Sequence, residues 1–282
     1  MESMADPAAP LRRNTTPTRV VAVNRSVASE RADRLATEEP MEIRAGGPGQ
    51  EPEAVAVTMR TPGGDFELAA GFLFTEGLIK PGDVEKVSYC ELPAEEQQYN
   101  VITVRLKRPF DAAALKRNFY ATSSCGICGK AALEDVEVHC APVASGPEVS
   151  ADVISSLPDK LREGQRVFEE TGGLHAAGLF TPQGELLSLR EDVGRHNAVD
   201  KLVGEALLAE QLPLSERILQ VSGRVSFEIV QKAAVAGVPI VAAVSAPSSL
   251  AVEAAERFRM TVVGFVRDGR LNVYSHPERI TT

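Results

Sequence analysis

Two closely spaced cysteines carry the most distinctive chemistry in the sequence. Residues 122–130 read TSSCGICGK, so that two residues separate Cys125 from Cys128, and the chain has only two other cysteines, Cys90 and Cys140. A Cys-x-x-Cys pair can bind zinc, cycle as a disulfide or carry a reactive thiolate. The residues around the pair bear on which of these applies.

The neighbours of the pair favour a reactive thiolate. Gly126 and Gly129 predict an exposed loop rather than a regular helix. Ser123, Ser124 and backbone amides can donate hydrogen bonds to a thiolate, and Lys130 can stabilise its charge. Such surroundings lower the pKa of a thiol and produce a nucleophile. The plainer alternative is an inert turn with two half-buried cysteines.

Zinc binding and thioredoxin-like redox cycling remain open alternatives. Cys125, Cys128, His139 and Cys140 offer the ligand types of a tetrahedral zinc site. However, His139 and Cys140 are adjacent in VEVHC, and a strand would point them to opposite faces. No second Cys-x-x-Cys is present, and the pair lies in mid-chain, whereas the thioredoxin motif follows the first strand of its fold.

A second group of polar residues, REDVGRHNAVDK, joins a predicted strand to a predicted helix. Its Gly194, Arg195, His196 and Asn197 fall at the helix N-terminus. Free N–H groups and the helix dipole attract phosphate there, and arginine adds bidentate bonds. We therefore predict an anion site, the alternative being a solvated connection that tolerates charge.

Further arginines occur in the segments SGRVSFE and FVRDGR. The first places Arg224 and the helix cap Ser226 at a strand-to-helix turn, where open α/β sheets bind ligands. The second presents Arg267 and Arg270 across a tight turn, which by itself is most often only a hairpin. Together they suggest a local pocket for an anionic ligand. The lone His175 in HAAG is slightly more typical of a buried, satisfied histidine than of a catalytic one.

Composition limits the functional classes. The 282 residues carry a net charge of -9 and are 44% hydrophobic, which allows a sizeable core in one or two domains. The negative charge argues against broad binding to nucleic acid. The sequence shows no secretion signal and no apolar run long enough to span a bilayer. We therefore expect a cytoplasmic protein without membrane association, in which a structural disulfide is disfavoured.

Hydrophobic periodicity predicts two parts. We expect a disordered tail over residues 1–17 and a β-rich domain over residues 18–110, with strands and one helix. A domain over residues 111–282 alternates strands and helices and begins with the cysteine segment, which predicts an α/β sandwich whose apolar strands are covered on both faces. The predicted strands are 19–24, 41–46, 54–60, 99–106, 217–223 and 239–246; the hairpins are 175–192 and 261–275; the helices are 66–77, 197–209, 226–237 and 248–259.

Several long segments resemble one family in sequence and in order. They are TSSCGICGK, LHAAGLF, REDVGRHNAVDKLVG, SGRVSFEIVQKAAVAGVPI and GFVRDGRLNVYSHPERI, preceded by TPGGDFELAAGFLFTEGLI. From roughly residue 40 to residue 280 the chain resembles the FdhD family, the formate dehydrogenase accessory sulfurtransferases.

The resemblance implies a definite activity. Family members are cytoplasmic, commonly dimeric proteins that take persulfide sulfur from a cysteine desulfurase. They pass the sulfur to the molybdenum (or tungsten) bis-molybdopterin guanine dinucleotide cofactor that formate dehydrogenase requires, which a guanine nucleotide can mimic. The C-terminal domain of the family has a cytidine-deaminase-like three-layer fold. The alternatives are a cofactor-binding chaperone without sulfur chemistry and a zinc-binding module.

The resemblance also implies roles for individual residues. The persulfide carrier corresponds to Cys125, with Cys128 assisting. We expect Arg195, His196 and Arg224 to help hold the cofactor. The cofactor-binding segment of the family matches Phe265, Val266, Arg267, Asp268, Gly269 and Arg270.

The deaminase-like fold does not imply deamination. Zinc deaminases carry H-x-E and P-C-x-x-C signatures. Here Ser124 precedes Cys125, and the nearest counterpart of H-x-E is His175-Ala176-Ala177, which follows the cysteines and lacks the glutamate. Because fold likeness does not transfer function, we disfavour deaminase activity.

Overall fold

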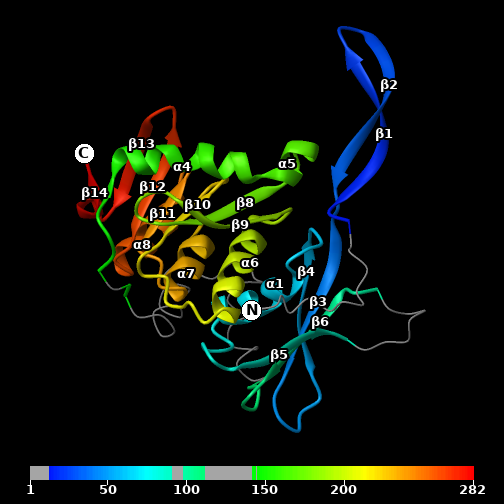
Figure 1. Cartoon of the computed structure of the whole chain (residues 1–282), viewed down its shortest axis with the longest axis vertical. Coiled ribbons are helices and arrows are strands. Elements are labelled where there is room, and N and C mark those ends of the chain that lie inside the picture. Colours follow the sequence, from blue (N-terminus) through cyan, green and yellow to red (C-terminus); the bar gives the residue numbers. More distant parts are fainter. Residues whose placement is uncertain (1–12, 91–97, 112–141, 144) are drawn as a thin grey trace.

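A computed structural model describes residues 13–90, 98–111, 142–143 and 145–282 (Figure 1). The predicted cysteine pair, Cys125 and Cys128, lies outside these residues, as do His139 and Cys140. The described strands form a six-stranded sheet, a four-stranded sheet and two two-stranded ribbons. None of the described helices combines the length and the apolar character that crossing a bilayer requires.

The six-stranded sheet forms the centre of the C-terminal part. Its order is β13-β12-β11-β10-β8-β9, in which β10, β11 and β12 run parallel and the remaining neighbours pair antiparallel. Both predicted hairpins are present in it. Its strands are β8 (His175–Phe180), β9 (Leu186–Asp192), β10 (Ile218–Val221), β11 (Ile240–Ala243), β12 (Thr261–Arg267) and β13 (Arg270–Ser275).

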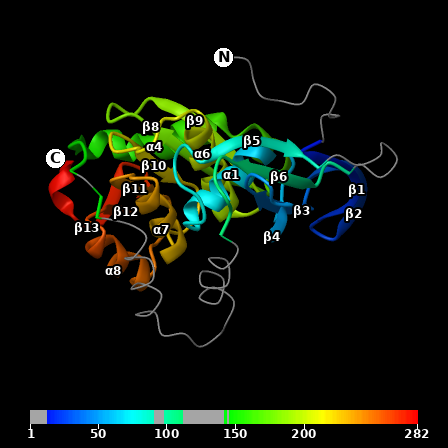
Figure 2. The ribbon, with the colours of Figure 1, turned by 90° about the horizontal axis from the view of Figure 1, so that it is seen from below.

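Helices cover both faces of this sheet (Figures 1 and 2). Ile240 and Ala242 of β11 belong to a buried cluster with residues of α4 on one face. Val241 and Ala243 point the other way, into a cluster with α6, α7 and α8. Both faces are therefore buried, which is why the strand is apolar at every position. The helices are α4 (Ala151–Gly164), α6 (Arg195–Leu208), α7 (Phe227–Val235) and α8 (Ser249–Arg257).

The N-terminal part packs against this sandwich through one helix. Helix α1 lies on the four-stranded sheet, of order β4-β3-β6-β5, and crosses α6 at backbone contact. A Cβ atom at Gly71 would overlap the carbonyl oxygen of Asp200, and one at Gly204 would overlap that of Glu67. The two parts therefore share one hydrophobic core. The elements are β3 (Glu39–Gly46), β4 (Glu53–Arg60), α1 (Asp65–Thr75), β5 (Val84–Tyr89) and β6 (Val101–Leu106).

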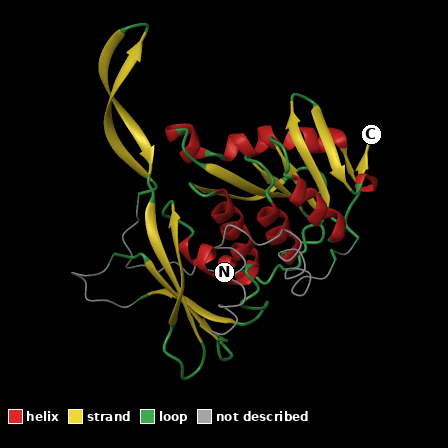
Figure 3. Ribbon diagram, turned by 180° about the vertical axis from the view of Figure 1, so that it is seen from behind, coloured by secondary structure: helices red, strands yellow, loops and turns green. Residues whose placement is uncertain are grey.

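A long ribbon projects from the body of the molecule (Figures 1 and 3). It consists of β1 (Thr15–Asn24) and β2 (Val27–Ala36), joined by a two-residue turn. Thr15, Thr16 and Pro17, which the sequence assigned to the disordered tail, are the first residues of β1. The charged segment VASERADRLA lacks the apolar alternation of a half-buried strand, so that β2 was not predicted.

Helix α4 is not among the predicted helices, and it contains an internal proline, Pro158. An internal proline removes a hydrogen bond and costs a helix about 3 kcal/mol. Ile154, Leu157 and Leu161 are buried on one face of α4 against the sheet. At about 1.5–3 kcal/mol each, their burial outweighs the proline. The remaining elements are α5 (Arg166–Thr171), β7 (Val149–Ser150), a 3-10 turn (Pro277–Arg279) and β14 (Ile280–Thr281).

Candidate functional site

The candidate site residues outside the cysteine segment lie at one edge of the six-stranded sheet. Strands β10, β11 and β12 are parallel and end at this edge. Strand β8 is antiparallel to β10 and therefore begins there, with Ala177 opposite Val221. Strand β9 ends there too, because its Asp192 pairs with His175. Ligands of open α/β sheets bind outside the carboxyl ends of parallel strands, which makes this edge the candidate site.

Arg195 and His175 meet beside the turn that follows β10. A Cβ atom at Gly223 would lie 3.5 Å from Nδ1 of His175 and 4.0 Å from Cδ of Arg195. Both side chains therefore lie within ordinary contact distance of this position. Arg224, the next residue, is exposed. The predicted group around α6 and the predicted group after β10 therefore form one site.

His196 is held by two groups of the segment that begins α7. Its Nε2 lies 3.1 Å from Oγ of Ser226 and 2.8 Å from Oε2 of Glu228. The hydrogen bond from His196 lowers the pKa of the Glu228 carboxyl, although partial burial opposes the shift. Ser226 is the N-cap residue of α7, yet its hydroxyl makes no capping bond to the helix. The helix N-terminus of α7 is thus tied to α6 by side chains.

Three helices begin at this edge. Gly194, Ser226 and Ser248 are the N-cap residues of α6, α7 and α8. The loops before α7 and α8 are bonded to each other, since the Ser248 amide donates to the carbonyl of Val225 at 2.9 Å. The N-termini of these helices bring partial positive charge and backbone N–H groups to the edge.

The half-buried Arg195 differs from the other half-buried or buried arginines of the described residues. Arg60 and Arg190 form ion pairs with carboxylates. Within the described part of the chain, Arg195 and Arg224 form neither an ion pair nor a hydrogen bond through the guanidinium. Guanidinium groups beside helix N-termini suit a phosphate or another multiply charged anion. The edge can therefore bind an anionic ligand.

The segment 265–270 lies at the same edge but farther along it. Strand β11 separates β12 from β10, so that this hairpin stands two strand positions from Arg224. Phe265 lies in the irregular stretch of β12 between Gly264 and Arg267, where its left-handed φ of 54° is unusual for a bulky residue. Its side chain is 37% exposed. Val266 is fully buried in the cluster on the α4 face, whereas Arg267 through Arg270 are exposed.

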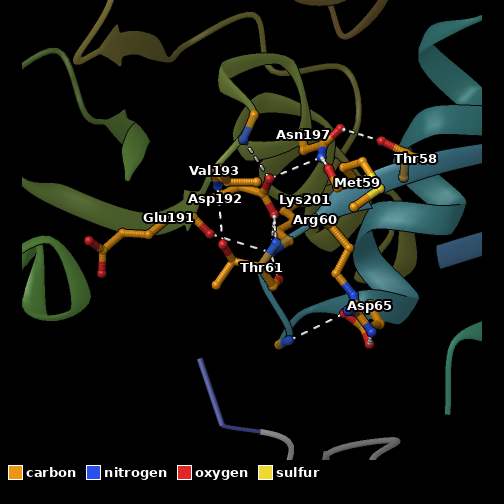
Figure 4. A network of polar contacts seen from close by, with 12 residues as sticks. Thr58, Met59, Arg60, Thr61, Asp65, Glu191, Asp192, Val193, Asn197 and Lys201 are labelled. Atoms are coloured by element: carbon orange, nitrogen blue, oxygen red, sulfur yellow. Dashed lines mark hydrogen bonds and ion pairs between the residues drawn. The ribbon is translucent and has the colours of Figure 1, made fainter. Parts of the chain in front are cut away.

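A buried polar network supports the loop that carries Arg195 and His196 (Figure 4). At its centre the carboxylate of Asp192, which is fully buried, accepts four bonds. They come from the Gly194 amide at 2.8 Å, Nδ2 of Asn197 at 2.9 Å, the Thr61 amide at 3.1 Å and Nζ of Lys201 at 2.7 Å. The network therefore fixes the start of α6.

The same network joins the two parts of the protein. Nζ of Lys201 also donates to the carbonyl of Thr61 at 2.8 Å, and Nδ2 of Asn197 donates to that of Met59 at 2.8 Å. Figure 4 shows the Asn197 and Lys201 side chains of α6 pointing toward the end of β4 and toward Thr61, which follows it. Next to them, the buried Arg60 forms an ion pair with Asp65 at 3.0 Å, which holds the turn before α1. The TPGGD turn of the N-terminal part thus positions the candidate site.

His175 is a site residue that sequence reasoning left without a role. Its environment lowers the pKa of the imidazole below its ordinary value: burial contributes most, the neighbouring Arg195 and His196 add to it, and Asp192 opposes it. Counting outward from the TPQG turn does not find its partner, because a register shift between Leu179 and Phe180 is needed to place His175 opposite Asp192.

The lowered pKa of His175 predicts a pH dependence of stability. The unfolded chain binds a proton at His175 near pH 6.5, whereas the folded chain binds it only at lower pH. As pH falls below about 6.5, this residue therefore reduces the free energy of unfolding. We expect His175→Gln to lose less stability than the wild type between pH 7 and pH 5, measured by urea unfolding. An equal loss in the two proteins would contradict the assignment.

The described residues contain no group of three or more His, Cys, Asp or Glu side chains placed to bind a metal ion. The proposed zinc ligands Cys125, Cys128, His139 and Cys140 lie outside the described residues, so that the zinc alternative is not tested by the structure. Cys90 is described and is half-buried after β5, far along the chain from the arginine-lined edge.

Comparison with known proteins agrees with the sequence resemblance. Residues 36–281 match the FdhD/NarQ family. The chain is 49% identical to a protein named sulfur carrier protein FdhD from Streptomyces coelicolor, over 93% of this chain and 94% of that one. It is 47% identical to a protein of the same name from Saccharolobus solfataricus, over 93% and 96%.

A solved structure has a similar fold. It is a crystal structure of a protein from Desulfotalea psychrophila described as a formate dehydrogenase accessory protein. The TM-score is 0.74 at 27% sequence identity, and the match covers 95% of this chain and 100% of that one. The match therefore includes both the N-terminal part and the six-stranded sandwich.

Proposed function

Since the chain belongs to the FdhD/NarQ family, we propose that it is a sulfurtransferase that carries sulfur for the maturation of formate dehydrogenase. The observation that supports this most directly is the meeting of Arg195, Arg224 and three helix N-termini at one edge of the sheet. Such an edge suits the phosphates of a dinucleotide substrate. We assign residues 111–282, which include the sandwich, to a cytidine-deaminase-like domain and residues 18–110 to a β-rich domain. We expect the protein to act in the cytoplasm.

Sulfur enters on Cys125. The Cys125 thiolate attacks the outer sulfur of a persulfide on a cysteine desulfurase, by the displacement that operates in thiol–disulfide exchange. A sulfur–sulfur bond forms at Cys125 as the one on the desulfurase breaks, and the desulfurase cysteine leaves as a thiolate. No electrons are gained or lost overall in this step.

The outgoing step requires two electrons, because persulfide sulfur becomes a sulfido ligand. Attack of the Cys128 thiolate on the inner sulfur of the Cys125 persulfide supplies them. The products are a Cys125–Cys128 disulfide and sulfide, which the metal of the molybdenum (or tungsten) bis-molybdopterin guanine dinucleotide substrate takes up. A dithiol reductant then restores both thiols for the next cycle.

The edge described above binds the phosphates and guanine of that substrate. Arg195 and Arg224 supply guanidinium groups, and His196 is fixed beside them by Ser226 and Glu228. We assign the second contact to the hairpin from Phe265 to Arg270. Its exposed Phe265 offers a ring for stacking against a base, and its arginines offer charge.

A nucleotide binding experiment tests this edge. A hydrogen bond to a charged group contributes about 1.5–3 kcal/mol. We therefore expect Arg195→Ala and Arg224→Ala each to weaken guanosine diphosphate binding by about tenfold or more in calorimetry. Arg267→Ala and Arg270→Ala should weaken it as well.

Arg217→Ala is the matched control, because Arg217 precedes β10 at the opposite end of the sheet and its guanidinium hydrogen-bonds only to the Glu216 carbonyl among the described residues. It should bind the nucleotide like the wild type. Unchanged affinity in both Arg195→Ala and Arg224→Ala would remove this edge from the substrate site.

A further inference from the structure

The projecting ribbon has an open strand edge. Strand β2 pairs with β1 and, within the described residues, with no other strand. Eight of its ten residues are exposed and none is buried. An isolated two-stranded ribbon is marginally stable in water, and an open edge is a template for pairing with another strand. The ribbon ends at residue 36, where the family match begins.

The register shows which backbone groups of β2 face outward. Asn24 and Val27 face each other on either side of the two-residue turn. Asn14 and Thr37 form a pair in the same register, and this pair is hydrogen-bonded, since the Thr37 amide donates to the Asn14 carbonyl at 2.9 Å. Bonded pairs alternate along an antiparallel ladder, so that odd-numbered residues of β2 bond to β1 and even-numbered residues point away. Consistently, the amide of Arg34 donates to its neighbour Asp33 at 2.9 Å instead of to β1.

The other edge of the ribbon is closed to pairing by proline. On β1 the outward-pointing backbone groups belong to odd-numbered residues, by the same register. Pro17 is one of them and has no amide hydrogen to donate. Proline on an edge strand prevents further pairing. Strand β2 is therefore the edge that can accept another strand.

The charges of β2 are self-complementary. Its central residues read Glu30-Arg31-Ala32-Asp33-Arg34. When a second copy of this segment runs antiparallel with Ala32 opposite Ala32, each glutamate faces an arginine (30 with 34) and each arginine faces an aspartate (31 with 33). Side chains opposite each other on paired strands interact directly, and opposite charges there are stabilising.

The ribbon by itself leaves this pattern unused. On β1 the residues opposite the four charges of β2 are uncharged, namely Val21, Val20, Thr18 and Pro17. The printed ion pairs of these charges are a local contact of Arg31 with Asp33 at 3.4 Å and a contact of Arg34 with Glu170 at 3.6 Å, both between exposed or half-exposed groups. Charged residues on an edge strand ordinarily prevent pairing with another strand. In β2 the order of positive and negative residues instead complements an antiparallel copy of β2 itself.

We propose that two copies of the chain pair through β2, antiparallel and centred on Ala32, to form a four-stranded sheet from two ribbons. The even-numbered residues exchange the backbone bonds between the copies, since their N–H and C=O groups face outward. Both charge pairs occur twice because the arrangement has twofold symmetry. The partner of this surface is thus a second copy of the same chain.

Charge reversal tests the register. Asp33→Arg places arginine opposite Arg31 at two symmetry-related positions, and we expect it to raise the dimer dissociation constant at least about tenfold in sedimentation equilibrium. The swapped double variant Arg31→Asp/Asp33→Arg restores both pairs and should return the constant to near the wild-type value. Glu85→Arg, an exposed reversal on β5, should leave it unchanged.

A cross-link tests the twofold position independently. Facing Cα atoms of a bonded antiparallel pair are about 5.5 Å apart, within the range that a disulfide spans. Under mild oxidation Ala32→Cys should give a peptide cross-linked from residue 32 to residue 32, identified by mass spectrometry. Ala28→Cys, which faces residue 36 of the other copy, should not link to itself. A monomer at all concentrations, or a dimer that ignores Asp33→Arg and forms no such cross-link, would overturn the proposal.

Discussion

Cys125→Ser is expected to abolish the maturation of formate dehydrogenase in cells that depend on this protein for sulfur transfer. A serine hydroxyl cannot form a persulfide, so that neither the incoming nor the outgoing step has a carrier. The expected result is loss of formate dehydrogenase activity to the level of cells without the protein, at equal protein abundance. Activity of the dehydrogenase in extracts measures it.

Cys90→Ser is the control for this experiment. Cys90 follows β5, where its amide bonds to the Val101 carbonyl at 2.9 Å, and we assign it no part in sulfur transfer. It should support full activity. Full activity in Cys125→Ser and in a Cys125→Ser/Cys128→Ser double variant would instead identify a cofactor-binding chaperone without sulfur chemistry.

Lys201→Met is expected to lower the free energy of unfolding by about 3–5 kcal/mol, because it leaves the carboxylate of Asp192 buried without its cation. The loss is a large part of the 5–15 kcal/mol that stabilises a typical protein. The substitution also removes the hydrogen bond from Lys201 to the Thr61 carbonyl, which joins the two parts of the molecule. Urea unfolding measures the change.

Lys86→Met is the matched control, because Lys86 is exposed on β5. It should change the free energy by no more than about 0.5 kcal/mol. Adding Asp192→Leu to Lys201→Met should not restore stability, since the carboxylate also accepts bonds from Gly194, Asn197 and Thr61. A loss for Lys201→Met as small as that for Lys86→Met would contradict the role of the network.

The sequence predicts the elements whose apolar pattern is local. Helices α1, α7 and α8 and the buried strands follow from hydrophobic spacing, and Ser226 occupies the predicted N-cap position of α7. The prediction placed the start of α6 at Asn197, whereas the helix begins at Arg195. The proposal of an anion site survives this shift, because both arginine-bearing segments reach one edge of the sheet.

The elements and site contacts that the sequence did not predict depend on contacts between residues distant in the chain. Pro158 disfavours a helix locally, and burial of α4 on the sheet outweighs that preference. Asp192 and Lys201 belong to the segment REDVGRHNAVDK, for which the sequence predicts an anion site with a solvated connection as the alternative. In the structure they are buried instead, in contact with the TPGGD turn from more than 100 residues earlier. No local sequence pattern predicts this burial. No local pattern predicts the proximity of His175 to Arg195 either.

Mass spectrometry of the protein after incubation with a cysteine desulfurase and cysteine tests the central claim most directly. We predict that the wild type gains the mass of one or more sulfur atoms, that a thiol reductant removes this mass, and that the gain maps to Cys125. It should persist in Cys128→Ser and vanish in Cys125→Ser. A wild type that gains no reducible sulfur, or a Cys125→Ser variant that gains it fully, would contradict the assignment of Cys125 as the sulfur carrier.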